Sequence, residues 1–219
     1  MQHFEQDISS FKEKLIGMAS RAEAAASHAM LALRDRNNDQ ATRIIAEDTI
    51  LDRLELEIDN TTIELLAKAP LAKDLRLITV GMKTAHELER IGDEATKIAR
   101  RVLELNLEPP LQERVDIYGL AESVLEILKS SLDSFVKQDS QTARSLIDRD
   151  KEIDALNRDI QTQLATLMSE NRDNVSRCLK LMVIAKSLER IADHAVNIAE
   201  EVVFLYEAED IRHAKHFRP

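Results

Sequence analysis

Two nearly identical phrases, about one hundred residues apart, constrain what this chain can fold into. The first, "HELERIGDEATKIARRV", spans residues 86–102, and the second, "SLERIADHAVNIAEEV", spans residues 187–202. Aligned from Leu88 and Leu188, they agree at Leu, Glu, Arg, Ile, Asp, Ala, Ile, Ala and Val. Similarity at a fixed offset indicates a duplicated structural unit, so the fold has to contain two copies of one arrangement.

The rest of the chain predicts what that unit is. Glycine and proline number only four each, and apolar residues recur at helical spacing between turn-forming stretches. The double proline at 109–110 divides the helices into two sets of three, and short connections place consecutive helices antiparallel. A single long coiled coil is disfavoured because the breaks recur. The predicted helices span residues 5–35, 39–68, 71–106, 112–137, 140–170 and 173–206.

The sequence therefore predicts an all-α protein made of two tandem, similar three-helix bundles. We place the first bundle at residues 1–109 and the second at residues 110–206. Residues 207–219 lose the helical periodicity, so we expect them to form a loosely held tail.

Composition excludes several function classes. The net charge is −10, and aromatic residues make up 3% of the chain without a tryptophan, which argues against a nucleic-acid partner. The single cysteine, Cys178, forms neither an internal disulfide nor a thiolate metal site. No apolar run approaches the roughly 20 residues of a membrane span, and the amino terminus is too charged for a signal peptide. We expect a soluble cytoplasmic protein that does not insert into the membrane.

Pairs of acidic residues one helical turn apart are the main candidate site. One pair lies in each repeated phrase and one in the middle helix of each half. Helical phase puts all four pairs beside the apolar stripe, on the same rotational side. The two pairs of each half lie at the same distance from the connecting turn to within about one helical turn. We therefore expect the acids to face a shared groove. The pairs are Asp48 with Asp52, Glu89 with Asp93, Asp150 with Asp154, and Glu189 with Asp193.

Two interpretations of these acids remain open from the pattern. Converging carboxylates repel one another unless protons, basic side chains or a metal ion compensate their charge. Oxygen ligands suit magnesium, calcium, manganese or iron. Alternatively, the acids are solvated on a helix flank and balanced by nearby basic residues, namely Arg53, Arg90, Lys151 and Arg190.

The phrases also carry a family resemblance. "PLAKDLRLITVGMKTAHELERIGDEATKIARRV", "SLERIADHAVNIAEEVVFLYEAEDIRH" and the duplicated three-helix plan resemble the PhoU family over nearly the whole chain. The resemblance implies a cytoplasmic regulator without enzymatic activity that often forms homodimers. It also implies partnership with a phosphate ABC transporter ATPase and a phosphate-sensing histidine kinase, and repression of the phosphate-starvation response. In this family such acid pairs bind metal ions, which matches the four pairs above.

The two phrases differ in ways that bear on the site. Lys97 follows Asp93 by one turn, so we expect it to compensate the charge of Asp93 and to reduce metal occupancy of the first site relative to the second. Ala192 replaces Gly92, a change expected to affect little beyond helix propensity. His194 lies about 100° around the helix from Asp193, which disfavours joint ligation. We expect His86 to be a surface residue, because "HELER" lacks the second histidine of a zinc protease motif.

Other residues point to no further chemistry. Arg90 and Arg190 are expected to pair with nearby acids, Cys178 to lie in the core, and His213 and His216 to be polar tail residues. No phosphate loop or nucleophile motif is present, so the chain is not predicted to be an enzyme. The alternatives to a metal-binding regulator are a structural interaction module without metal and, least favoured, a carboxylate-metal hydrolase.

Overall fold

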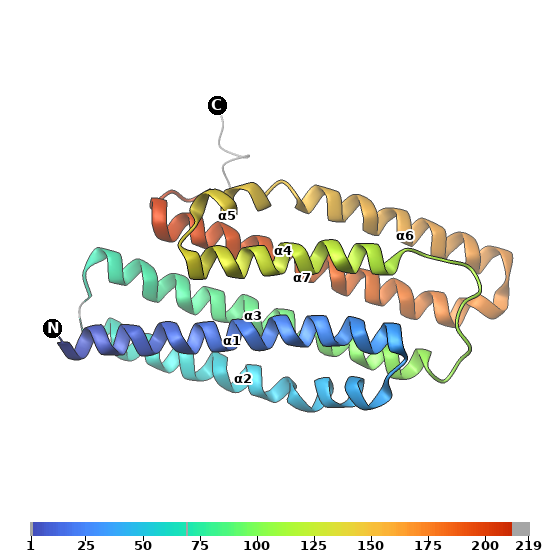
Figure 1. Ribbon diagram of the computed structural model, residues 1–219, viewed down its shortest axis with the longest axis horizontal. Coiled ribbons are helices and arrows are strands. Elements are labelled where there is room, and N and C mark those ends of the chain that lie inside the picture. The colour runs from blue at the N-terminus through green and yellow to red at the C-terminus, as the bar shows by residue number, and fades with distance from the viewer. Residues whose placement is uncertain (1, 69, 212–219) are drawn as a thin grey trace.

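The computed structural model describes residues 2–68 and 70–211 (Figure 1). These residues form helices and no strand, which confirms the all-α prediction. None of the described helices is apolar over a long enough stretch to span a membrane. The helices are α1 (Gln2–Asp35), α2 (Asn38–Leu66), α3 (Ala72–Leu105), α4 (Ile117–Lys137), α5 (Ser140–Leu146), α6 (Asp150–Glu170) and α7 (Val175–Glu207), with a short 3₁₀ helix, η1, at Arg172–Asn174.

Side-chain caps set several helix starts. The Asn37 side chain accepts a hydrogen bond from the backbone N–H of Gln40, at 3.0 Å, and opens α2. Asp116 likewise accepts from Gly119 N at 2.9 Å and opens α4. The predicted start of the fourth helix at residue 112 is therefore wrong, because the capping aspartate comes four residues later and the intervening chain continues the linker.

The prediction of one helix over residues 140–170 is also wrong. Residues 147–149 form a turn that separates α5 from α6, and the N–H of Arg149 donates to the carbonyl of Leu146 at 3.0 Å. The guanidinium of Arg149 binds Glu126 of α4 at 3.1 Å, a tertiary contact that holds the turn in place. No glycine or proline marks this turn, and the apolar spacing continues through it, so nothing in the local sequence signals that the helix is interrupted. The turn makes Asp150 the first residue of α6, where the helix dipole stabilises negative charge.

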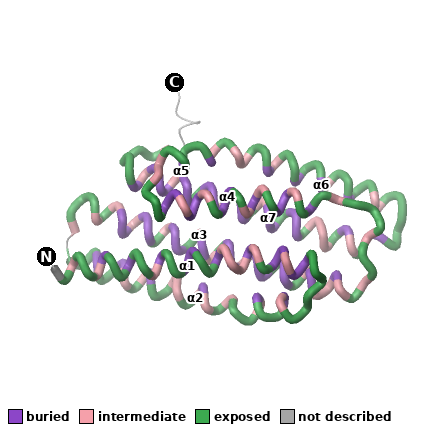
Figure 2. Tube along the Cα trace, in the orientation of Figure 1, coloured by how far each residue is buried: buried purple, intermediate pink, exposed green. Residues whose placement is uncertain are grey.

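The helices pack as two bundles joined along one interface (Figure 1). In the first, α1, α2 and α3 contact one another, and in the second, α4, α5 and α6 pack against α7. The bundles meet chiefly where α3 packs against α7, with a smaller contact between α1 and α4. Figure 2 shows purple, buried residues concentrated along these inner helices. Alanines such as Ala95, Ala99, Ala195 and Ala199 are fully buried and let the inner helices approach closely.

Glycines allow two further close approaches. A Cβ added at Gly81 would lie 2.5 Å from Cε1 of Phe11 and 2.8 Å from Cδ1 of Leu15, both buried side chains of α1. A Cβ added at Gly92 would overlap Cδ1 of Leu51 on α2. The expectation that glycine at position 92 matters only through helix propensity is therefore wrong, because this position also sets how closely α2 and α3 pack.

Polar contacts fix the register of the interface between the bundles. Lys83 pairs with Glu201 at 3.0 Å, near the start of α3 and the end of α7, and Glu94 pairs with Arg190 at 3.3 Å. Residues early in one helix thus contact residues late in the other, so α3 and α7 run antiparallel. Glu94 is buried, and bonds from Lys97, Ser187 and Arg190 outweigh the effect of burial and lower its pKa.

The chain leaves α7 in an ordered contact. Ala208 ends the helix with a positive φ of 58°, and the guanidinium of Arg144 binds Glu209 at 2.7 Å. The start of the predicted tail is thus held against α5. His213 and His216 lie outside the described residues.

Candidate metal centre

The first acidic cluster lies where α2 and α3 face one another. Asp48 and Asp52 lie on α2, and Glu89 and Asp93 lie on α3. Partial burial raises the pKa of Asp48, and the nearby charges of Asp93 and Asp52 add to this effect, whereas a hydrogen bond of 3.0 Å from Thr96 opposes it. The electrostatic contacts between the two helices show that the predicted pairs do share one surface.

Glu89 is a half-buried acid of this cluster. Burial raises its pKa, and Asp93, Glu55 and Asp52 raise it further. Its Oε2 atom is buried without a hydrogen-bond partner, although Nε of Arg90 lies 3.2 Å away as an ion pair. An enclosed carboxylate oxygen with such partial compensation is a suitable ligand for a cation.

The second cluster lies between α6 and α7 and repeats this arrangement. Burial, followed by the charge of Asp150 and then that of Glu189, raises the pKa of Asp193 to about 6. Asp150 Oδ1 and Glu189 Oε2 are buried without a hydrogen-bond partner, and Lys186 forms an ion pair with Glu189. Asp154 is half-buried on α6, and it is not among the residues that raise the pKa of Asp193.

The basic neighbours differ from the sequence-based expectation. Lys97 donates to Glu94 at 2.8 Å, so the prediction that it compensates Asp93 is wrong; Arg90 approaches Asp93 at 3.4 Å instead. Arg53 donates to the carbonyl of Thr49, and Lys151 pairs with Asp148. Within the described residues, neither of these two side chains pairs with an acid of the two clusters.

The arginine of each repeated segment and His194 all contact acidic side chains. Arg90 pairs with Glu89 and Arg190 with Glu94, which confirms the predicted ion pairs. His194 Nδ1 lies 2.6 Å from Glu87 Oε2, across the interface between the bundles. His194 is thus directed away from the acid pair next to it, in agreement with the expectation that it is not a joint ligand.

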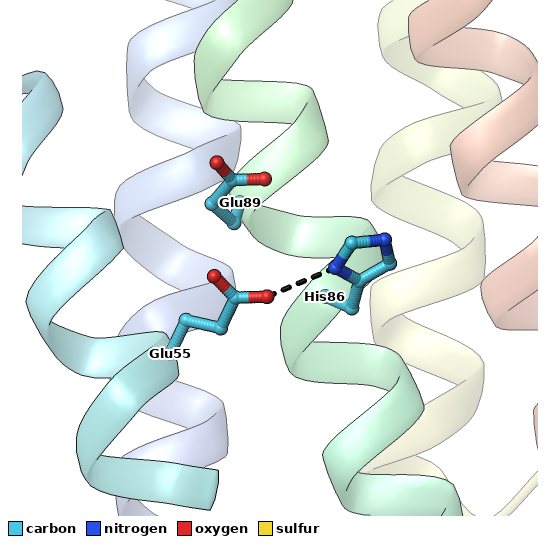
Figure 3. A group of neighbouring side chains, drawn as sticks. All are labelled: Glu55, His86 and Glu89. Carbon is cyan, nitrogen blue, oxygen red and sulfur yellow. Dashed lines mark hydrogen bonds and ion pairs between the residues drawn. The ribbon is translucent and has the colours of Figure 1, made fainter.

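Sequence reasoning missed one convergent group, which consists of Glu55, His86 and Glu89 (Figure 3). One ligand atom from each lies within 4.8 Å of the other two. Glu55 lies one turn after Asp52, and His86 lies one turn before Glu89, so both extend the predicted acid pairs along their helices. That i, i+3 spacing was the available signal.

The side chains present fit hard divalent cations. Three carboxylate oxygens of the predicted pairs, in Glu89, Asp150 and Glu189, are buried without hydrogen-bond partners. The two clusters repeat at equivalent places in two similar bundles. These features define a class of protein: a duplicated, all-helical bundle pair with one acidic inter-helix surface in each half.

The comparisons with known proteins identify the family. The PhoU domain matches residues 15–102 and 117–202, one match in each bundle, so the chain belongs to the PhoU family. Among curated proteins, the chain is 33% identical over 211 residues to the Escherichia coli (strain K12) phosphate-specific transport system accessory protein PhoU, covering 96% of this chain and 88% of that protein. It is 37% identical over 209 residues to the Aquifex aeolicus homologue, covering 95% of each chain.

Solved structures agree with the fold. The crystal structure of PhoU from Pseudomonas aeruginosa matches with a TM-score of 0.91 at 33% identity, covering 94% of this chain and 100% of that one. The Streptococcus pneumoniae phosphate transport system regulatory protein PhoU matches with a TM-score of 0.88 at 26% identity, covering 95% of this chain and 99% of that one.

Proposed function

We propose that this protein is a non-enzymatic accessory regulator of a phosphate-specific transport system, and that its acidic clusters bind metal ions. The observation that carries the proposal is the similarity, over 96% of the chain, to accessory proteins of such systems. The protein would act in the cytoplasm on the transporter ATPase and the sensor histidine kinase, as a negative regulator of the starvation response.

The metal part of the proposal rests on the acid clusters. Glu89 and Asp93 face Asp48 and Asp52 in the first cluster, and Glu189 and Asp193 lie near Asp150 in the second. All-oxygen donors suit iron, manganese, magnesium or calcium. Such an ion would supply positive charge where the carboxylates now repel one another.

One observation favours regulation without metal. Arg90 and Lys186 already form ion pairs with the two enclosed glutamates, Glu89 and Glu189. If these pairs balance the clusters, the protein is a helical interaction module whose acidic surfaces bind basic partners directly. With or without metal, the protein could form a homodimer through α2, where Leu56 is 60% exposed and Ile63 is 66% exposed.

A genetic experiment tests the regulatory function. In a strain lacking this protein, we expect a reporter of the phosphate-starvation response to remain active in high phosphate, and the wild-type chain to restore repression. A normal phosphate response in the deletion strain would contradict the proposal.

Metal analysis tests the clusters separately. We expect protein purified without an affinity tag to carry bound metal, and the variant with Glu189→Ala and Asp193→Ala to lose the metal of the second cluster while remaining helical by circular dichroism. Absence of metal from both proteins would favour the interaction module, and repression by the metal-free protein would show that regulation does not need the ion.

A further inference from the structure

Glu55, His86 and Glu89 form a mixed nitrogen and oxygen donor set beside the first acidic cluster. Glu55 projects from α2, and His86 and Glu89 project from successive turns of α3 (Figure 3). His86 Nδ1 lies 2.9 Å from Glu55 Oε1, and a ligand atom of each of the three residues lies within 4.8 Å of the others. Two helices thus present three potential ligands close to one another.

Burial differs among the three donors in a way that suits a metal site. The Glu89 side chain is 13% exposed, and its Oε2 is buried without a hydrogen-bond partner, although it forms an ion pair with Nε of Arg90 at 3.2 Å. The His86 side chain is 54% exposed. The carboxylate therefore forms the floor of the site, and the imidazole lies at its mouth. An imidazole at the surface can exchange its hydrogen bond to Glu55 for a bond to an ion arriving from solvent.

The donors adjoin an acidic cavity between the two bundles. This cavity of about 490 Å³ is bounded by α2, α3 and α7, and Glu55 and His86 form part of its wall. Further carboxylates from Asp59, Glu87 and Glu200 line it. Lys83, its basic residue, is paired with Glu201. Grouped acids in a partly enclosed space attract cations and raise their local concentration.

The second bundle provides an internal comparison. Alignment of the repeats places Asn157 at the position of Glu55 and Lys186 at the position of His86, while Glu189 matches Glu89. Lys186 forms an ion pair with Glu189, so its ammonium group occupies the place next to the glutamate. Asn157 is buried and accepts a hydrogen bond from Gln161 at 3.2 Å. At this position the second bundle therefore carries a lysine beside the glutamate, whereas the first carries a histidine and its glutamate pairs with Arg90.

We propose that Glu55, His86 and Glu89 bind a divalent transition-metal ion of the Zn²⁺ type, in preference to Mg²⁺ or Ca²⁺. Imidazole nitrogen binds Zn²⁺ and its neighbours in the first transition row well, whereas Mg²⁺ and Ca²⁺ prefer oxygen ligands. Three protein donors at a solvent-facing mouth leave positions for water. The site shares Glu89 with the first acidic cluster, but it needs no metal in the acid pairs of the proposed function.

The test measures Zn²⁺ binding by titration calorimetry in excess Mg²⁺, which competes for oxygen-only sites. The main variant is His86→Lys, which introduces the residue of the second repeat at an exposed position, and Glu55→Gln is the second. The control is His3→Lys, which removes an exposed histidine of α1. We expect Zn²⁺ binding to weaken at least tenfold in the first two variants and to remain unchanged in the control.

A spectroscopic measurement assigns the ligand directly. On addition of Zn²⁺ to the wild-type protein, we expect the ¹⁵N resonances of the His86 imidazole to shift, with little change in those of His194. Zn²⁺ affinity unaltered by His86→Lys, or imidazole resonances of His86 unmoved at saturation, would overturn the proposal. The variant with Glu189→Ala and Asp193→Ala alters the second cluster and leaves Glu55, His86 and Glu89 intact. Failure of the acid-pair proposal is therefore distinguishable from failure of the Zn²⁺ site proposed here.

Discussion

Replacing Gly81 by alanine tests how closely α1 and α3 pack. The added Cβ would lie 2.5 Å and 2.6 Å from two ring carbons of Phe11 and 2.8 Å from Leu15 Cδ1. Phe11 is fully buried and Leu15 is 1% exposed, so neither side chain has room to move outward. The substitution therefore forces side-chain or helix displacement within a filled core.

The magnitude follows from two opposing effects. Alanine favours a helix interior over glycine by about 1 kcal/mol. Overpacking a filled core costs about 1–3 kcal/mol, and three contacts shorter than 3.0 Å place this site in the upper part of that range. The net loss expected for Gly81→Ala is about 1–2 kcal/mol, which lowers the Tm by about 2–8 °C in a chain of this size.

Gly17→Ala is the matched control. Gly17 also lies within a helix, but a Cβ there would have no atom within 4 Å, so only the helix-propensity effect remains. We expect Gly17→Ala to stabilise the protein by up to about 1 kcal/mol. The assay is urea unfolding followed by circular dichroism, with Tm as a second measure. Equal stabilisation by both substitutions would refute the argument that α1 and α3 are in close contact at Gly81.

Four further predictions concern the charged groups. In metal-free protein, Asp150→Asn should move the pKa of Asp193 from about 6 toward 3.8, as measured by side-chain ¹³C NMR. A pKa that stays near 6 would show that burial and Glu189, rather than Asp150, cause the shift. Folding raises the pKa of Asp193, so the stability linked to this group is complete below about pH 3.8 and is lost as the pH rises through 6. Over this pH range, the unfolding free energy of the metal-free wild type should therefore fall more than that of Asp193→Asn. Glu94→Gln should destabilise the protein by about 1–2 kcal/mol in urea unfolding, since it weakens charged hydrogen bonds to half-exposed Lys97 and Arg190. A loss of stability below about 0.5 kcal/mol would contradict this role of Glu94. Mn²⁺ at about 100 times its Kd should stabilise the wild type by about 2.7 kcal/mol and raise its Tm by about 5–10 °C. EDTA should abolish this increase in Tm, and no change in Tm on adding Mn²⁺ would contradict binding to the folded state.

Much of the fold was predictable because helices are specified locally. Apolar spacing, turn residues and the repeated phrase gave six helical regions in two sets of three, since each signal depends only on neighbours within a few turns. The same periodicity placed the acid pairs of Asp48, Asp52, Glu89 and Asp93 on one flank. The electrostatic contacts among these residues follow from that rotational phase.

Residues that act across helices were less predictable. Glu55 and His86 met because the axial positions of α2 and α3 bring these turns to the same height, a property that neither helix encodes alone. Lys97 had two acids within reach along its own helix, Asp93 and Glu94, and the structure shows that it binds the buried one. Local spacing gives the candidates, and packing selects among them.

The sequence by itself determined the helical class, the duplication and the four acid pairs, because periodicity and repetition are properties of a linear chain. Only the tertiary structure decided the turn at 147–149, the antiparallel packing of α3 on α7, and the convergence of Glu55 with His86. Each of these depends on contacts between distant segments, such as Arg149 with Glu126 and Lys83 with Glu201. Such contacts depend on how helices that are distant in the chain pack against one another, and local sequence spacing does not specify that packing.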